Sequence, residues 1–199
     1  VDLRQRHEVT LYTHAAPSHV PDGWRDALRI VPGAGGTRWE QWSLQRALAT
    51  DRPDVLFAPG YTAPLACPAP VALAVHDVSF FAHPEWFGRR EGLRRRHVTA
   101  WSARRAKVVL VPSAFSVSEI VRHIGLDTAR IRLVYIAVRP PASPPRPTRE
   151  PMVLFVGSLF QRRRLDVLID AFAEVARTRG WSTTVTQRGD SPLCSTRGN

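Results

Sequence analysis

His76 and Asp77 follow directly on an apolar run and are the residues in this chain best suited to chemistry. The run 71–75 has the composition of a buried strand, and the imidazole and carboxylate end it. Open α/β sheets place their ligand sites outside the carboxyl ends of such strands. An imidazole titrates near neutral pH, so His76 could act in acid–base chemistry or contact a ligand hydroxyl. The structural alternative is that both residues cap the strand and the turn that follows.

Ser113 ends a second apolar run in the same way. The run 107–111 is followed by Pro112 and Ser113, and a predicted helix with Ser116 near its start comes next. The free amides and the dipole at a helix N-terminus favour an anion or a hydroxyl-rich ligand. Capping of the helix explains both serines equally well.

A glycine turn and three arginines lie between a later predicted strand and its helix. Gly157 and Ser158 permit close backbone approach, and the guanidinium groups of Arg162, Arg163 and Arg164 suit a diphosphate. A solvated run of charge is the structural alternative.

Two further segments have two interpretations each. The aromatic segment 80–87 predicts packing or an acceptor-side loop. The basic run 89–96 predicts a solvated face or contact with phosphate or anionic lipid.

The net charge of the chain limits the kinds of ligand that it is expected to bind. The formal charge of +11 is carried by arginine, since Lys107 is the only lysine. Such a balance favours phosphate-bearing ligands, anionic membranes or nucleic acid. We expect no nucleic acid, because no aromatic-basic RNA-binding signature and no helix-turn-helix pattern occurs.

Cysteine content and hydropathy predict the compartment. Cys67 and Cys194 lie far apart in dissimilar surroundings, so we expect neither a disulfide framework nor a metal site. No apolar run approaches the roughly 18 residues that span a bilayer, and no secretory leader opens the chain. We therefore expect a cytoplasmic protein.

Short apolar runs alternate with amphipathic ones, which predicts a doubly wound, parallel, Rossmann-like α/β sheet. Thr37 and Glu40 have capping-box spacing before one helix, and Ser116 and Glu119 repeat it before another that ends at Gly125. A third helix places its apolar residues from Leu165 to Val175 on one face. The predicted strands are 8–12, 54–58, 71–75, 107–111, 131–136 and 152–156.

Proline content divides the chain. Residues 139–151 hold six prolines in thirteen positions, which excludes a helix interior or a central strand and predicts a linker. We predict one domain over 1–138, the first βα unit of an incomplete second Rossmann-like domain over 152–180, and a disordered tail over 181–199.

In this order the segments resemble the retaining glycosyltransferases with two Rossmann-like domains, the GT-B fold, specifically the group 1, family 4-like class. The resemblance covers about residues 50–179 and is carried by 75–80, 83–87, 102–106, 111–116, 130–134 and 153–172.

The resemblance implies the transfer of a sugar, with retention, from a nucleotide-diphosphate sugar to a glycan or lipid-linked acceptor, without a metal or other cofactor. It implies that the first domain binds the acceptor and the second the donor. His76 would then act at the reaction centre and Ser113 would line the cleft. Asp77, Gly157 and Ser158 would also contact substrate or donor. Arg162 and Arg163 would bind the donor diphosphate, and peripheral contact with the inner face of an anionic membrane stays open.

Three departures from the family pattern lead us to expect a truncated chain with weak donor binding and little turnover. The family's first strand and glycine-rich loop do not precede the run 8–12. The turn after the run 131–134 lacks its glycine. The paired glutamates that hold the donor are missing, since no Glu follows Glu174, and the residues after Gly180 resemble a frameshift or an early end.

Two other functions compete with the transferase. One is a non-catalytic basic module, or degenerate paralogue, that binds anionic lipid or nucleic acid and loses affinity steeply with salt. The other is a nucleotide-binding oxidoreductase. It is disfavoured because no Gly-x-Gly-x-x-Gly turn opens a βα unit, and the segment 33–36 lacks the required spacing.

Overall fold

The computed structural model describes residues 3–138, 153, 155–157 and 160–179. The chain divides into two compact units, Val1–Arg139 and Pro140–Asn199. Each unit is described by itself below.

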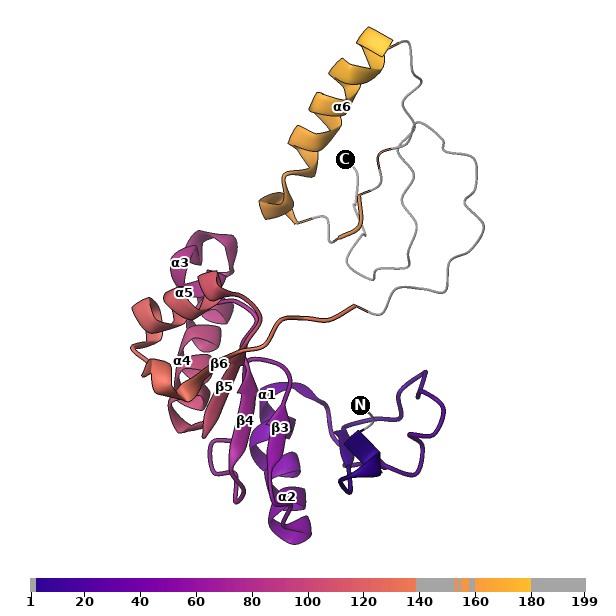
Figure 1. Ribbon diagram of the computed structural model, residues 1–199, viewed down its shortest axis with the longest axis vertical. Helices are drawn as coiled ribbons and strands as arrows, with labels where there is room; N and C mark the ends of the chain where they lie inside the picture. The colour runs from indigo at the N-terminus through magenta and orange to yellow at the C-terminus, as the bar shows by residue number, and fades with distance from the viewer. Residues whose placement is uncertain (1–2, 139–152, 154, 158–159, 180–199) are drawn as a thin grey trace. The chain divides into compact units, whose positions relative to one another are not determined.

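Two parallel sheets form the framework of the first unit, and Figure 1 labels the strands of the larger one. The smaller sheet pairs β1 (Leu11–Thr13) with β2 (Leu28–Ile30). The larger sheet has four strands in the order β3-β4-β5-β6. Parallel strands with helices packed on them confirm the predicted α/β, Rossmann-like fold class. The strands of the larger sheet are β3 (Leu56–Ala58), β4 (Val71–Ala74), β5 (Val108–Val111) and β6 (Ile131–Leu133).

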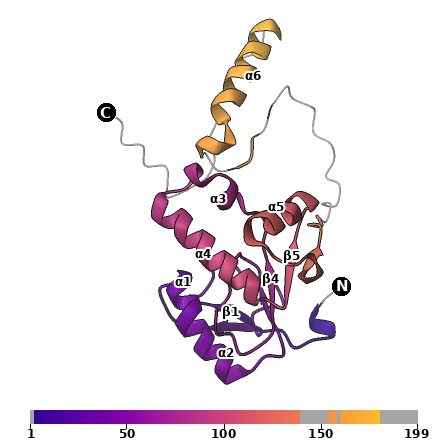
Figure 2. The same ribbon diagram turned by 90° about the vertical axis from the view of Figure 1, so that its left-hand side faces the viewer.

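The hydrophobic core lies on one face of the larger sheet. The strand register places Ala58, Leu73, Val109 and Ile131 in one row across this face, and all four are buried. Helices α4 (Arg89–Arg105) and α5 (Ala114–Ile124) contact the strands and add small and branched side chains to the same core (Figure 2). The opposite face is more open, since Phe57 is 57% exposed.

The first long helical stretch begins differently from the prediction. It runs through α1 (Gly36–Arg38), the π-helical η2 (Trp39–Leu44) and α2 (Gln45–Asp51). Its N-cap is Gly35, which makes no side-chain capping bond, so the predicted Thr37–Glu40 capping box is wrong. Glu40 instead accepts a hydrogen bond from Thr62, 22 residues along the chain. A long-range partner has replaced the local one.

Helix α5 also begins at a different residue. Its N-cap is Ser113, whose Oγ accepts a hydrogen bond from the Ser116 amide, so the predicted capping box at Ser116–Glu119 is wrong. Ser116 lies inside the helix and is buried. The predicted end is confirmed, because Gly125 adopts the left-handed conformation with φ 68°.

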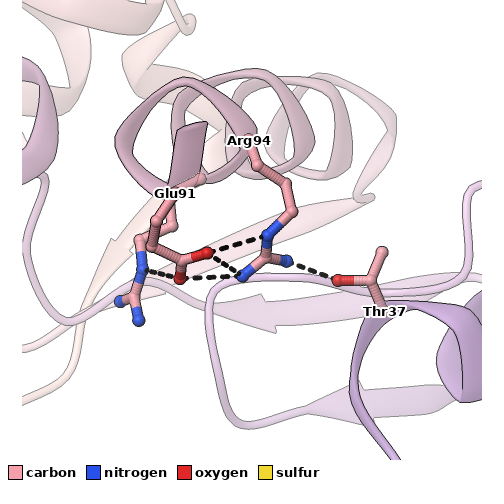
Figure 3. Close-up of polar contacts among 4 residues, drawn as sticks. Thr37, Glu91 and Arg94 are labelled. Carbon is pink, nitrogen blue, oxygen red and sulfur yellow. Dashed lines mark hydrogen bonds and ion pairs between the residues drawn. The ribbon is translucent and has the colours of Figure 1, made fainter. Parts of the chain in front are cut away.

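Helix α4 was not predicted, since its segment was interpreted as aromatic packing followed by a charged run. The helix is buried through small residues, among them Gly92, Ser102 and Ala103, and these give little hydrophobic periodicity. Arg94 fixes its outer side by donating hydrogen bonds to Glu91 on the same helix and to Thr37 on α1 (Figure 3). The short helices α3 (Ser79–Ala82) and η3 (Pro84–Trp86) precede it.

The shortest elements complete the first unit. They are the 3-10 turns η1 (Leu3–Gln5) and η4 (Thr128–Arg130). Strand β2 was not predicted from the sequence, and the observed strands are shorter than the predicted ones. Within the described residues no helix is both long enough and apolar enough to cross a lipid bilayer.

The second unit contains the 3-10 turn η5 (Gln161–Arg163) and helix α6 (Leu165–Arg179). The helix lies where the sequence predicted one. Of the predicted strand 152–156, the described residues Val153, Phe155 and Val156 are not in a strand. The predicted linker at 139–151 and the tail from 181 lie outside the described residues, and the predicted domain boundaries stay predictions.

Candidate functional site

The carboxyl ends of three neighbouring strands bring polar side chains together. His76 and Asp77 follow β4, Ser113 follows β5, and Tyr61 follows β3. The sequence predicted the first three as site residues but not Tyr61. Because parallel strands end at the same edge of the sheet, the loops after them form one surface, which is where ligands of open α/β sheets bind.

Asp77 is held by hydrogen bonds to both of its carboxylate oxygens. Tyr61 Oη donates to Asp77 Oδ2 at 2.9 Å. The amide and hydroxyl of Ser79 donate to Oδ1 at 2.9 and 2.6 Å. The Ser79 bonds are those of an Asx turn, so the structural interpretation of Asp77 as a turn cap accounts for one oxygen. The Tyr61 bond is long-range and fixes the carboxylate beside the imidazole.

The His76 ring is oriented by a backbone carbonyl. Its Nε2 lies 3.0 Å from the Pro59 oxygen. A carbonyl only accepts, so Nε2 carries the proton in this bond, and Nδ1 of the neutral ring is left as an acceptor. The Tyr61 ring meets the imidazole edge to face, with the ring centroids 5.6 Å apart. His76 is exposed, and its Nδ1 is therefore suited to accept a hydrogen bond from a ligand hydroxyl.

Tyr61 has an unusual backbone conformation. Its φ of 65° lies in the left-handed region. This conformation is unfavourable for any residue with a Cβ, and it persists only where surrounding contacts stabilise it. Its amide donates to the Ala74 carbonyl at 2.9 Å, which ties the loop to β4. Such conformations cluster at functional sites. The turn dipeptide Pro59–Gly60 after the run 54–58 is a sequence signal that could have drawn attention to this position, but it was not used.

The loop that carries Tyr61 is fastened from both sides. Thr62 donates to Glu40 at 2.7 Å, and the Gln41 side chain bonds the backbone of Ala63 and Leu65. From the other side Ser102 of α4 accepts a hydrogen bond from the Ala63 amide. Burial raises the pKa of Glu40, and the hydrogen bonds from Thr62 and Gln41 oppose that rise. These contacts supply the constraint that the strained Tyr61 backbone needs.

The two serines at the start of α5 connect the helix to the site. Ser113 Oγ accepts from the Ser116 amide and lies 3.0 Å from Ser116 Oγ. Ser116 Oγ donates in turn to the His76 carbonyl at 3.1 Å. Capping, which the sequence left as an alternative, is thus what Ser113 does in this structure. Ser116 thereby holds the backbone of His76, the residue that the family resemblance would put at the reaction centre.

Aromatic side chains pack next to the polar groups at this edge of the larger sheet. Phe80 is buried and contacts the rings of Tyr61, Phe81 and Phe87 at centroid distances from 5.3 to 6.2 Å. The segment 80–87 therefore packs, as one of the two sequence interpretations held. Aromatic side chains packed beside polar groups are a common composition for a small-molecule site.

The predicted donor residues lie in the second unit. The Arg162 guanidinium stands over the Phe160 ring at 5.3 Å, and the Arg163 amide donates to the Phe160 carbonyl. A Cβ at Gly157 would come within 3.3 Å of the Phe155 ring, so the glycine allows a close approach there. Ser158 lies outside the described residues. Over the part of the chain that the structure describes, no group of three or more His, Cys, Asp or Glu side chains could hold a metal ion.

A family model matches most of the chain. A model of the family described as Glycosyltransferase Family 4 matches residues 2–142. No curated protein matches the chain. No solved structure matches it either. The matched residues include the whole edge formed by Tyr61, His76, Asp77 and Ser113.

Proposed function

Because this chain belongs to glycosyltransferase family 4, we propose that it takes part in the transfer of a sugar from a nucleotide-diphosphate sugar to an acceptor, with retention at the anomeric carbon. The family membership supports a transferase in general. The donor, the mechanism and the role of each residue are parts of the proposal.

The observation that carries the proposal is the bond between His76 Nε2 and the Pro59 carbonyl, beside the Asp77 carboxylate. It leaves Nδ1 able to accept a hydrogen bond from a sugar hydroxyl. Asp77, fixed by Tyr61, offers a second acceptor on the same edge. Hydroxyl groups donate well to such acceptors, so this edge suits a sugar, and in the transferase it would hold the sugar at the reaction centre.

The donor diphosphate is assigned to the second unit. Arg162 and Arg163 would bind its oxygens with their forked donors, and the turn at Gly157 and Ser158 would let the backbone approach it. Arg163 stands where the resemblance has a lysine, which keeps the charge and changes the geometry. The nucleotide sugar is a co-substrate, and the proposal includes no resident cofactor.

Helix α4 suggests how an acceptor on a lipid carrier would be reached. The helix has seven arginines and one acidic residue. Leu93 and Trp101 are 51% and 57% exposed, and with His97 they fall at i, i+4 and i+8 along its outer side. Basic charge around exposed apolar side chains suits the surface of an anionic membrane. We therefore include peripheral contact at the inner face of a membrane, which the non-catalytic alternative would share.

Ligand-observed NMR with a panel of nucleotide-diphosphate sugars tests the sugar site. We expect one donor or more to give saturation transfer from the protein to its sugar protons. The loss of one hydrogen bond in the variant His76→Ala should weaken that binding about five- to tenfold.

Arg122→Ala is the matched control, since its side chain is 76% exposed on the outer side of α5 and touches neither strand end. It should bind like the unchanged chain. Binding that is the same in His76→Ala and in the control would contradict the assignment of the sugar to this edge. Binding only to anionic vesicles, with steep salt dependence, would favour the non-catalytic basic module.

A further inference from the structure

A cavity of about 790 Å³ lies at the opposite edge of the larger sheet from the candidate site. Its wall comes from the loop before β4, from the junction of α4 with β5, and from the turn η4 with the start of β6. These segments lie at the amino ends of parallel strands, whereas His76 and Ser113 follow the carboxyl ends. The cavity is therefore separate from the sugar site.

The charge of the wall is one-sided. Arg105, Lys107, Arg130 and Arg132 line the cavity, and no Asp or Glu is among its lining residues. Within the described residues none of these four forms an ion pair with a carboxylate, whereas Arg94 and Arg95 on α4 both pair with Glu91. Like charges gathered without a counter-charge favour the binding of an anion.

Two of the four cations are held in place by backbone carbonyls. The Arg130 guanidinium donates to carbonyls at the C-terminal end of α4, those of Ala103, Arg104 and Ala106. These are carbonyls that a helix end leaves without intrahelical donors. Arg132 donates to the carbonyls of Ala129 in η4 and of Ile131 at 2.8 and 3.0 Å. Fixing these side chains in the free protein lowers the entropy lost when a ligand binds.

The remaining wall is apolar. It is built by Leu65 and Pro70 of the proline-rich segment before β4, and by Val71 at the start of that strand. Cys67 also lies here, and burial raises the pKa of its thiol, so the thiol stays protonated at neutral pH and adds no negative charge. A wall that is basic on one side and apolar on the other suits a ligand with a phosphate group and an apolar body.

We propose that this cavity is a second binding site, for the phosphate group of a small phosphorylated ligand, in which Arg105, Lys107, Arg130 and Arg132 neutralise the phosphate. The site goes beyond the proposed transfer reaction and does not depend on it. The phosphate could belong to a free phosphate compound or to a lipid headgroup.

Titration calorimetry on the full chain tests the site, with inorganic pyrophosphate and with a soluble short-chain phosphatidic acid as separate probes. We expect saturable binding that weakens as salt rises. The double variant Arg105→Ala/Lys107→Ala removes two exposed cations and should weaken binding about tenfold or more. Arg122→Ala, which removes one cation outside the cavity, is the control and should stay within about twofold. Tighter binding of the phosphatidic acid identifies a lipid headgroup, and tighter binding of pyrophosphate identifies a free phosphate.

Backbone NMR of the unchanged chain tests the same site without any substitution, so it applies even if the double variant fails to fold. The probe should shift the amide signals of Lys107 and Arg132 and leave that of His76 in place. The variant Arg162→Ala/Arg163→Ala should bind the probe normally, which separates this site from the diphosphate site of the proposed transferase. The absence of saturable binding, an equal loss in the control, or shifts spread over all basic surfaces would overturn the proposal.

Discussion

Removal of the Ser116 hydroxyl should loosen the connection between helix α5 and the end of β4. The buried Oγ donates to the His76 carbonyl at 3.1 Å and lies 3.0 Å from Ser113 Oγ. Each bond is worth about 1 kcal/mol, and alanine returns about 0.5 kcal/mol through its higher helix propensity. Ser116→Ala should therefore lower the free energy of unfolding by about 1 to 1.5 kcal/mol.

Ser118→Ala is the matched control on the same helix. Ser118 is exposed, and among the described residues its hydroxyl bonds only the carbonyl of Phe115 in the preceding turn. The change should stay within about 0.5 kcal/mol. Ser113→Ala should cost about 1 kcal/mol through loss of the N-cap.

Urea unfolding followed by tryptophan fluorescence measures these differences. Because Ser113 and Ser116 share a hydrogen bond, the double variant should lose about 0.5 to 1 kcal/mol less than the sum of the two single losses. Equal stability of Ser116→Ala and Ser118→Ala would refute the connection. Additive losses from the two serines would refute the shared bond.

Three further variants test the core and two titrating groups. Leu73→Ala removes a fully buried side chain from β4 and should cost about 2 to 5 kcal/mol in urea unfolding, and a loss under 1 kcal/mol would show that β4 is not central. The pKa of the Glu40 carboxyl is raised in the folded protein, so folding favours the protonated acid. The stability that Glu40 contributes is fully present below its pKa in the unfolded chain, and it is lost as the pH rises through its pKa in the folded protein. From about pH 4 to 7 the unchanged chain should therefore lose stability relative to Glu40→Gln, and parallel pH profiles would contradict this. Burial and the bond to Asp51 raise the pKa of Tyr12 to about 12, so stability should fall from about pH 10 to 12 in the unchanged chain but not in Tyr12→Phe, as thermal unfolding would show.

The sequence predicted the framework of the site because strand ends have a local signature. An apolar run that stops at a polar residue marks the carboxyl end of a buried strand, and His76, Asp77 and Ser113 all lie at such ends. Gly125 marked the end of α5 for an equally local reason, since glycine tolerates the left-handed conformation.

The contacts that shape the site are long-range, and the sequence did not reveal them. Tyr61 meets Asp77 across 16 positions, and Glu40 meets Thr62 across 22. Each of these residues has a plausible local role, and for Glu40 the local interpretation as a capping residue was wrong. Helix α4 was missed because the face that it buries consists of small residues, which give no hydrophobic stripe in the sequence. Its position is set by tertiary packing.

Nitrogen NMR of the His76 imidazole tests the central claim most directly. Long-range proton–nitrogen correlation spectra at mildly alkaline pH distinguish a protonated from an unprotonated ring nitrogen. The geometry predicts a protonated Nε2, bonded to Pro59, and an unprotonated Nδ1 whose signal moves when a nucleotide-diphosphate sugar binds. A proton on Nδ1 in the free protein, or an Nδ1 signal that stays in place while the sugar binds, would contradict the assignment of His76 to the sugar site.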